Sequence, residues 1–429
     1  MNSATGSTLP YDVADAEAQG IELVGYHDLE KRGGLKLALH VADDRWYLYV
    51  GSLWHTGVSV LDVTDPSQPR LAKWLEGPKN TFTFQVQVAD GKLINGLERP
   101  FPGYGHDPEA AREGFDIYDL ADPEDPKLIG SWSTGPEPGS APPGQPILFH
   151  GTHRNYYDGG RYVHASSTAA GFQGYIYRII DIEDPSDPVE VGRWWLPEQW
   201  WGGGVEEPRP WLFLHGPAWV EGDRAFCSWA DGGMVILDIS DLTAPTLVSQ
   251  LNIGAALGSP LGVHTVVPLP ERQLVVMNSE ALAEGGSRDE PVNYTMIVDV
   301  SDETSPKIIS SLPIPAPPEG SPYASFYDKP GRFGPHNQHH SQHHPDLLDR
   351  QDKVYLAYFN AGLRVFDISN AHVPHEVAYF IPPDPKERFG PLPTDALVTQ
   401  FEDVLVDRRG YIYTTDKNYG IHILRETDA

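Results

Sequence analysis

The sequence contains a single cysteine, Cys227, among its 429 residues. One thiol excludes an internal disulfide, and it also excludes zinc and iron–sulfur sites that need several cysteine ligands. Cys227 lies in an alternating run from Arg224 to Trp229, and this pattern favours a buried strand residue over a nucleophile. A metal site in this chain would therefore depend on nitrogen and oxygen ligands.

Basic residues are also scarce: 31 Lys and Arg stand against 60 Asp and Glu, which gives a net charge of -29. This surplus of negative charge would repel phosphate backbones and anionic lipids, so we expect neither nucleic acid nor membrane as a partner. Residues 1–10 contain no basic residue and no apolar signal-peptide core, and no apolar run approaches the roughly 18 residues of a membrane helix. We expect a soluble, cytoplasmic protein that acts on a small molecule, with its oligomeric state left open.

Motifs of nucleotide and serine chemistry are absent from the sequence as well. There is no Gly-rich phosphate loop, no nucleophile elbow and no His-Glu-x-x-His helix. In contrast, the 42 Gly, 40 Pro, 20 Tyr and 11 Trp are typical of many short strands joined by turns.

One pattern recurs along the chain: a Gly or Tyr, an apolar strand, an Asp, and a polar turn that ends in Pro. The repeated Asp residues lie 57 to 68 residues apart, at Asp62, Asp119, Asp181, Asp238, Asp299 and Asp367. This period fits one four-stranded propeller blade per repeat, and Asp and Pro are the residues that build its hairpins. We interpret these Asp residues as structural.

A seventh copy, residues 420–425, lacks its outer strand. The segment Ile21–Tyr26 matches the outer strands of other copies, such as residues 126–130. The sequence therefore predicts an all-β fold, a single seven-bladed β-propeller over residues 21–425 in which residues 21–30 complete blade seven. Residues 1–20 are predicted to form an N-terminal extension.

Four histidines precede the innermost strands of successive blades, namely His153, His215, His264 and His336. His153 and His264 each stand eight residues before an Arg, and His215 stands nine before one, so these three are predicted to share one position near the ring axis. Neutral imidazoles are common ligands of iron, copper and zinc, so the set predicts a mononuclear metal centre, with iron as our first choice. In the alternative interpretation each His bonds a carbonyl of a neighbouring blade. His150, His339 and His340 are possible replacements.

In a propeller, the loops between the second and third strands open on the same face as the segments that enter the innermost strands. They supply Glu280, Glu98 and His55 as candidate catalytic residues, since a carboxylate near a His-bound metal can orient an imidazole or act as a general base. Each is alternatively a satisfied polar residue or a hairpin cap. Two long loops, residues 194–204 and 313–332, would roof the pocket for a hydrophobic substrate or else pack over the rim.

These motifs resemble the bacterial LVIVD-repeat family of seven-bladed propellers. The resemblance rests on the Leu-Asp-Ile-Ser type strands, on residues 193–200 and on the closing segment 412–420, and it extends from about Ile21 to Leu424. It implies the fold, and no single activity. In layout rather than sequence, the chain also resembles the carotenoid-cleavage oxygenases, whose axial histidines hold iron, and this analogy implies the same role for the four strand-preceding histidines.

Two classes of function follow. The first is a metal-dependent oxidoreductase or lyase that carries out oxidative or cleavage chemistry on a small hydrophobic or aromatic molecule. The alternatives are a non-catalytic propeller that binds a protein or small ligand, and a metal-independent lyase or hydrolase that uses Glu280 with a histidine.

Overall fold

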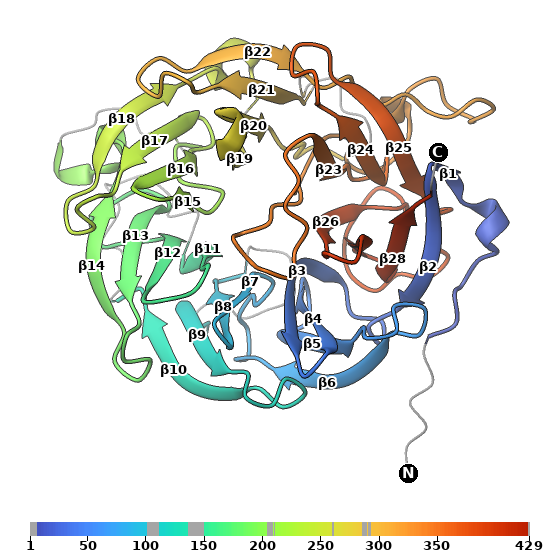
Figure 1. Ribbon diagram of the computed structural model, residues 1–429, viewed down its shortest axis with the longest axis horizontal. Helices are drawn as coiled ribbons and strands as arrows, with labels where there is room; N and C mark the ends of the chain where they lie inside the picture. The colour runs from blue at the N-terminus through green and yellow to red at the C-terminus, as the bar shows by residue number, and fades with distance from the viewer. Residues whose placement is uncertain are drawn as a thin grey trace.

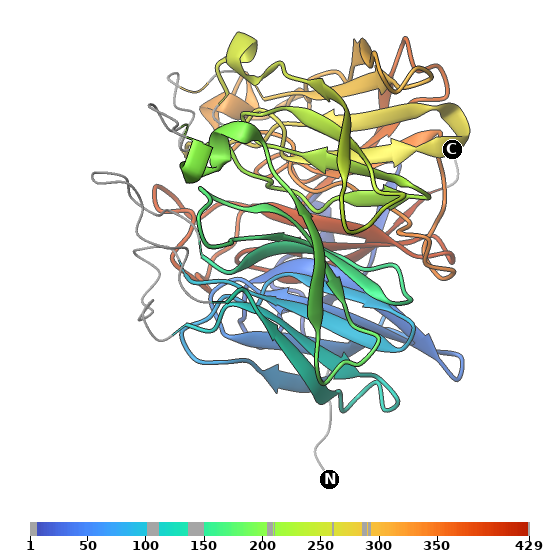
Figure 2. The same ribbon diagram turned by 90° about the vertical axis from the view of Figure 1, so that its left-hand side faces the viewer.

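The computed structural model describes residues 7–100, 111–135, 150–203, 209, 211–259, 261–284, 290 and 293–427. Its strands form seven four-stranded antiparallel sheets around a common centre (Figure 1). Seen from the side, the sheets lie one beside the next as the blades of a thick disc (Figure 2). The all-β, seven-bladed propeller predicted from the repeats is confirmed.

Blades one to five follow the chain from the axis to the rim. Blade one contains β3 (Gly34–Ala42), β4 (Arg45–Ser52), β5 (Gly57–Asp62) and β6 (Arg70–Glu76). Blade two contains β7 (Val86–Ala89), β8 (Lys92–Leu97), β9 (Gly114–Asp119) and β10 (Lys127–Ser133). Blade three contains β11 (Thr152–Tyr156), β12 (Tyr162–Ser167), β13 (Ile176–Asp181) and β14 (Val189–Trp194). Blade four contains β15 (Trp219–Glu221), β16 (Arg224–Ser228), β17 (Met234–Asp238) and β18 (Thr246–Leu251). Blade five contains β19 (Thr265–Leu269), β20 (Leu274–Asn278), β21 (Thr295–Asp299) and β22 (Lys307–Ser311).

Blade six is built differently. It contains β23 (Lys353–Ala357), β24 (Leu363–Asp367) and β25 (His375–Ile381), and β1 (Glu17–Gln19) is added outside β25. Because the repeated Asp ends β24, β24 corresponds to the third strand of the other blades. The innermost position is held by residues 336–340, where Gln338 pairs with Leu356 in an isolated bridge. The segment predicted as an N-terminal extension thus contributes a strand to this blade.

Blade seven closes the ring. It contains β26 (Phe401–Val406), β27 (Tyr411–Asp416), β28 (Gly420–Glu426) and, as its outermost strand, β2 (Ile21–His27). The pairing of β2 with β28 joins an N-terminal strand to the C-terminal strand, and these two strands lie side by side in Figure 1. This is the closure by an N-terminal strand that the sequence predicts.

Short helical segments lie in the connections. They are α1 (Gly254–Leu257), η1 (Val13–Asp15), η3 (Pro197–Gln199), η4 (Trp201–Gly203), η5 (Pro270–Arg272) and η6 (Phe326–Asp328). Within the described ranges, no helix has the length and apolarity needed to cross a bilayer.

The repeated Asp residues end the third strands, and we call them the turn ring: Asp62, Asp119, Asp181, Asp238, Asp299 and Asp367. In each, the carboxylate accepts a hydrogen bond of 2.8–3.0 Å from the backbone N–H two residues later. An Asp side chain that bonds its own backbone in this way stabilises the turn to the outer strand. The structural interpretation of these residues is confirmed.

Glycines in the outer strands let neighbouring blades approach closely. A Cβ on Gly25 would lie 2.0 Å from the carbonyl oxygen of Pro66, and one on Gly192 would lie 1.8 Å from that of Leu242. The strand register shifts by a β-bulge at these positions. Since Gly25 is in blade seven and Pro66 is in blade one, the closing interface repeats the contact between blades three and four.

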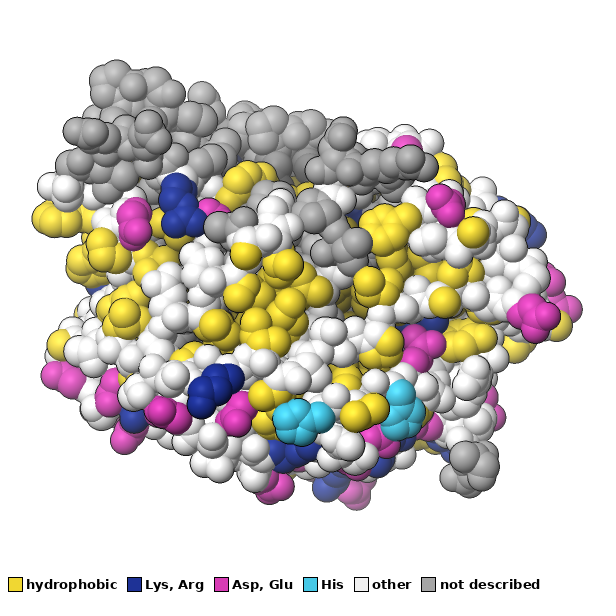
Figure 3. Space-filling model, turned by 90° about the horizontal axis from the view of Figure 1, so that it is seen from above, with side chains coloured by type: hydrophobic (Ala, Val, Ile, Leu, Met, Phe, Trp, Pro, Cys, Tyr) yellow, Lys and Arg dark blue, Asp and Glu magenta, His cyan; other side chains and the backbone are white. Residues whose placement is uncertain are grey.

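Apolar side chains fill the space between adjacent blades. Cys227 is fully buried in one such cluster, beside Leu237 and Trp229, and burial raises the pKa of its thiol. Burying apolar surface contributes about 25 cal/mol per Å², so the inter-blade clusters hold the ring together. The rim shows hydrophobic side chains gathered among charged ones (Figure 3).

Candidate metal centre

Three of the predicted histidines occupy one backbone position in their blades. The N–H groups of His215, His264 and His336 donate to the carbonyl oxygen of the last residue in the second strand, at 2.9, 2.7 and 2.9 Å. The shared position that the spacing predicts for His215 and His264 therefore exists, and His336 has it too although blade six lacks a regular innermost strand.

A β-bulge places His153 at the corresponding point of blade three. Thr152 pairs with the last residue of β12, and the register shifts between Thr152 and Arg154. Because a bulge sets two residues opposite one, both His153 and Arg154 reach the cavity described below. Blade seven has the same bulge around Glu402. We call His153, His215, His264, His336 and Glu402 the axial ring.

Four members of the axial ring, His153, His215, His336 and Glu402, line a cavity of about 420 Å³, the axial cavity. Its polar lining consists of Gln85, His153, Arg154, His215, Glu280, Arg332, His336, Glu402 and Lys417. Its other lining residues are Leu35, Leu53, Phe82, Phe84, Tyr175, Trp211, Phe213, Leu261, Leu282 and Leu392. The two loop sets that were predicted to share a face both contribute to this cavity.

The imidazole rings follow one another around the axis. Ring centroids lie 4.6 Å apart for His153 and His215, 4.3 Å for His215 and His264, and 4.6 Å for His264 and His336. The Nε2 atoms of His153 and His215 are 3.2 Å apart. Two nitrogens bound at about 2.1 Å to one tetrahedral or octahedral ion would be roughly 3.0–3.4 Å apart, so this spacing suits a shared metal.

Glu280 lies among these rings. Its Oε2 atom is 3.4 Å from Nε2 of His264 and 3.7 Å from Nε2 of His215, and its Oε1 atom is 3.8 Å from Nε2 of His336. Arg332 donates to Oε1 at 2.9 Å. Burial raises the pKa of Glu280, and the charges of Arg332 and Arg154 oppose that shift. Ligand atoms of His215, His264 and Glu280 lie within 4.8 Å of one another.

The outward-facing Nδ1 atoms of His153 and His336 have partners of their own. Nδ1 of His153 is 3.1 Å from both oxygens of Glu98, and Nδ1 of His336 is 2.5 Å from the backbone oxygen of Glu402. These acceptors hold the proton on Nδ1 and leave the Nε2 lone pair facing the axis, as metal-binding histidines require. The Tyr175 hydroxyl in turn donates to Glu98.

His264 differs from the other histidines. It is fully buried, and its Nε2 atom accepts a hydrogen bond of 2.9 Å from Arg154. His153, His215, His336 and Glu280 line the axial cavity, whereas His264 does not. Burial lowers the pKa of His215, His264 and His336, so these imidazoles are neutral near pH 7. Only neutral imidazoles can bind a metal.

The sequence-predicted residues thus divide into two groups. His153, His215, His264, His336, Glu98 and Glu280 form one cluster. His55 is exposed and does not line the axial cavity.

The three possible replacements lie elsewhere. Both ring nitrogens of His339 bond backbone atoms, of Leu348 and Val406, and His340 stacks on Trp219. Nδ1 of His150 is 3.9 Å from Glu113. None of the three lines the axial cavity, so none takes the place of an axial histidine.

Arg154, Glu402 and Lys417 line the axial cavity but were not among the sequence-predicted site residues. Lys417 forms a 2.6 Å ion pair with Glu402, and both line the axial cavity. Extending the position of the axial histidines into blade seven leads to Glu402, because this residue lies at the start of the innermost strand, β26.

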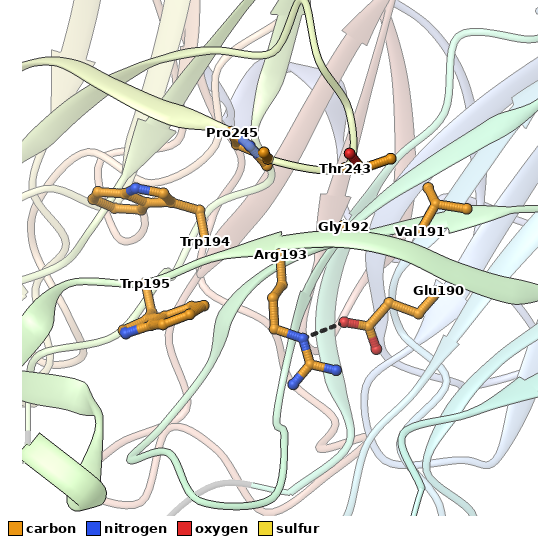
Figure 4. Close-up of a pocket in the computed structure, with 9 residues that line it drawn as sticks. Glu190, Val191, Gly192, Arg193, Trp194, Trp195, Thr243 and Pro245 are labelled. Atoms are coloured by element: carbon orange, nitrogen blue, oxygen red, sulfur yellow. Dashed lines mark hydrogen bonds and ion pairs between the residues drawn. The ribbon is translucent and has the colours of Figure 1, made fainter.

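The loops predicted as a roof lie mostly elsewhere. Trp194 and Trp195 border a shallow hollow between β14 and the turn before β18 (Figure 4). Trp194 packs edge-on against Trp229, so this loop covers the rim. The one charged pair in the hollow, Arg193 with Glu190, is already satisfied at 2.5 Å. Of the second loop, only Arg332 lines the axial cavity.

Comparisons with known proteins bear on the fold. A model of the LVIVD repeat matches residues 46–74, 172–195, 218–252, 292–312 and 352–380. No curated protein is significantly similar in sequence.

Two solved structures illustrate the structural likeness. The β-propeller domain of Cps50 (Swd1) from Myceliophteria thermophila has a TM-score of 0.53 and 10% identity, over 92% of this chain and 98% of that one. A functionally unknown protein from Desulfotomaculum acetoxidans DSM 771 has a TM-score of 0.48 and 12% identity, over 81% of this chain and 89% of that one. At such identities, the likeness to Cps50 shows the fold alone.

Proposed function

Starting from a chain that carries LVIVD repeats and folds as a seven-bladed β-propeller, we propose that it is a metal-dependent enzyme whose mononuclear centre lies in the axial cavity. The proposed ligands are the Nε2 atoms of His153, His215 and His336 together with the Glu280 carboxylate. The observation that carries the proposal is that His153 and His336 each have an Nδ1 acceptor, while their Nε2 atoms lie 3.2 Å from Nε2 of His215 and 3.8 Å from Oε1 of Glu280, respectively.

The donor set indicates which metals fit. Nitrogen and carboxylate ligands without thiolate suit iron(II), copper or zinc, and we place iron first. A bound iron would supply oxidative chemistry, and a bound zinc would supply Lewis-acid chemistry. His264 would join the ligands only if the hydrogen bond from Arg154 to the Nε2 atom of His264 were broken.

The chain's own residues have separate tasks in this proposal. Glu98 orients His153, and the Glu402 backbone orients His336. Arg332 positions Glu280, whose second oxygen would accept a proton from substrate. The apolar walls of the cavity would exclude water and favour a small hydrophobic or aromatic molecule.

One observation favours a second function, a propeller that binds a ligand without metal. Arg154 donates to the Nε2 atom of His264, and a cation at that point opposes a bound metal ion. In this alternative the axial cavity would hold a small molecule, and its carboxylates and histidines would serve only as hydrogen-bonding groups.

Elemental analysis of protein purified without an affinity tag tests the proposal. We expect about one iron, copper or zinc per chain in the wild type, and a loss of most of it in His215→Ala and Glu280→Gln with retained β-sheet circular dichroism. His55→Ala, which changes an exposed imidazole outside the cavity, is the matched control and should keep its metal. A wild type that stays far below one metal per chain after supplementation with each of these metals would overturn the metal centre.

The effect of a chelator on melting gives an independent readout. A ligand that binds only the native state raises its stability, by about 2.7 kcal/mol at a hundred times its dissociation constant. Chelation should therefore lower the melting temperature of the wild type and leave that of His215→Ala unchanged. Equal melting of the wild type with and without chelator would favour the metal-free function.

A further inference from the structure

Arg154 is a buried cation that has no counter-ion among the residues that the structure describes. It lines the axial cavity from blade three, and the residue is 5% exposed. Its two hydrogen bonds, each 2.9 Å long, go to neutral atoms, Oδ1 of Asn337 and Nε2 of His264. Its Nε atom has no hydrogen-bond partner among the described residues. No carboxylate in the described ranges lies within ion-pair distance of its guanidinium.

The neighbouring cations are different. Arg332 pairs with Glu280 at 2.9 Å, Lys417 pairs with Glu402 at 2.6 Å, and Lys36 pairs with Asp403 at 3.0 Å. A buried charge costs several kcal/mol unless it is paired. Arg154 is thus the cation at this site that still has capacity for an anion.

A guanidinium is suited to one kind of partner. It carries five N–H groups in a planar fork that matches the two oxygens of a carboxylate. Only two of these N–H groups have acceptors in the described structure. The remaining N–H groups of Arg154 can donate hydrogen bonds to an anionic oxygen of a ligand.

With a metal bound, charge balance points the same way. Arg332, Lys417 and Lys36 are each neutralised by the carboxylate with which they pair. The remaining negative charge, on Glu98, offsets the positive charge of Arg154. The site is therefore balanced as it stands. A divalent cation at the proposed metal centre would add two positive charges, and an anionic ligand would offset part of this excess.

The walls define the rest of the ligand. Aromatic rings adjoin one another around the cavity: Phe82 and Phe84 have centroids 5.2 Å apart, Tyr175 and Phe213 are 5.8 Å apart, and His153 stacks on Tyr175 at 5.3 Å. A flat apolar body packs well against such faces. The volume of about 420 Å³ lies in the range of small-molecule sites.

We infer that the ligand of the axial cavity is a small aromatic carboxylate, with its ring against Phe84, Tyr175 and Phe213 and its carboxylate on Arg154. This inference names the substrate class of the enzyme proposed above and rests on that proposal for catalysis. The contribution of Arg154 to binding does not depend on the metal.

Two isosteric probes test the inference, 2-naphthoate and its uncharged amide, 2-naphthamide. Their affinities for the full chain are measured by titration calorimetry. We expect 2-naphthoate to bind tighter by a factor on the order of ten to a hundred, because a hydrogen bond to a charged group is worth about 1.5–3 kcal/mol. Equal affinity of the two probes, or no binding of either, would overturn the inference.

Variants assign the preference to Arg154. Arg154→Gln should bind both probes equally, while its affinity for 2-naphthamide stays near that of the wild type. Arg425→Gln, which removes an exposed guanidinium at the rim, is the control and should keep the preference. An Arg154→Gln variant that folds by circular dichroism and still prefers 2-naphthoate would contradict the assignment. If Arg154→Gln does not fold, Arg154→Lys replaces it, and an undiminished preference there would also contradict the assignment, since an ammonium lacks the fork.

Chelator-treated protein separates this inference from the metal proposal. We expect the preference for 2-naphthoate to persist in protein freed of metal. A preference that appears only after loading with iron or zinc would place the carboxylate on the metal and overturn the role of Arg154. Absence of metal from every preparation would overturn the metal centre and leave the binding prediction intact.

Discussion

The turn ring and the axial ring come from the same repeat, yet only one of them is uniform. Six blades place an Asp in the turn ring, and each carboxylate makes the same bond to its own backbone. The axial ring has histidine in blades three to six and Glu402 in blade seven, while Leu35 of blade one lines the same cavity. Uniform positions serve the fold that all blades share, and positions that vary from blade to blade are available for chemistry.

This contrast predicts that the two rings respond to different measurements. Changes in the turn ring or at the contacts between blades should alter the free energy of unfolding and leave metal content alone. Changes in the axial ring should alter metal content and ligand binding more than unfolding, because their side chains face a cavity instead of filling the apolar clusters between blades.

Removal of the closing strand should have the largest effect. Deleting residues 1–28 removes β2 and its ladder with β28, in which each hydrogen bond contributes about 0.5–1.5 kcal/mol net, together with the buried side chain of Ile21. The combined loss rivals the total stability of about 5–15 kcal/mol of a typical protein. We expect the truncated chain to be insoluble or aggregation-prone in expression trials.

Shorter deletions sharpen this test. Deleting residues 1–20 removes β1 from blade six but spares β2, so we expect a soluble protein with a lower melting temperature. Deleting residues 1–6 spares the bond between Ser7 and Asp28 and the packing of Tyr11 on Tyr419, and it should be neutral. A fully stable protein without residues 1–28 would refute the closure.

Acid should destabilise the protein through buried histidines outside the axial ring. Burial lowers the pKa of His164 to about 4 and that of His422 to about 3. In the unfolded chain both histidines titrate near pH 6.5. Their contribution to the free energy of unfolding is therefore fully present above pH 6.5. It is lost as the pH falls toward 4 and 3, by about 3–5 kcal/mol for each group.

The variant His422→Phe isolates one of these groups. His422 is surrounded by aromatic rings, including those of Tyr26 and Phe401, and neither of its ring nitrogens has a hydrogen-bond partner in the described structure. A Phe there should move the midpoint of acid unfolding, followed by circular dichroism, to lower pH. His372→Asn, which changes an exposed histidine, should not move it. An unchanged midpoint in His422→Phe would exclude this histidine as a source of acid lability.

The contact between blades is expected to tolerate change poorly. In Gly25→Ala the new Cβ would lie 2.0 Å from the carbonyl oxygen of Pro66, so one of the two backbones must shift. Overpacking of this kind costs about 1–3 kcal/mol, measurable by denaturant unfolding. Glu22→Ala, on the same strand and in an exposed ion pair, should change stability by about 0.5 kcal/mol or less. Equal stability of the two variants would show that the closing interface is looser than the structure indicates.

Sequence reasoning predicted the fold well because the repeats carry it directly. The spacing of the repeated Asp residues and the match of residues 21–26 to other outer strands were enough for seven blades and their closure. The four axial histidines and the acids Glu98 and Glu280 were predictable for the same reason. Residues at the same point of each repeat occupy the same point of each blade, so their positions in the sequence predict where they lie in the ring.

The rest depends on local departures from the repeat. In a regular strand, neighbouring side chains point to opposite faces, so His153 facing the axis would turn Arg154 away. The bulge at Thr152 brings both side chains to the cavity, and no residue in the sequence predicts that bulge. The same limit applies to residues 54 and 55, of which the structure buries Trp54 and exposes His55.

The smallest expected effect concerns one member of the turn ring. Asp238 accepts hydrogen bonds from the N–H of Ser240 at 2.9 Å and from its hydroxyl at 2.6 Å. Asp238→Ala removes both, and because the turn is exposed and water can replace the lost acceptor, we expect a loss of about 0.5–1.5 kcal/mol in the free energy of unfolding. Asp238→Asn keeps an acceptor oxygen and should recover most of that loss, even though its pairing with Arg224 is gone, because exposed ion pairs contribute little. Both variants should bind metal and 2-naphthoate as the wild type does. If Asp238→Ala loses metal or ligand, the turn ring affects the axial site, and the separation of the two rings into structure and chemistry fails.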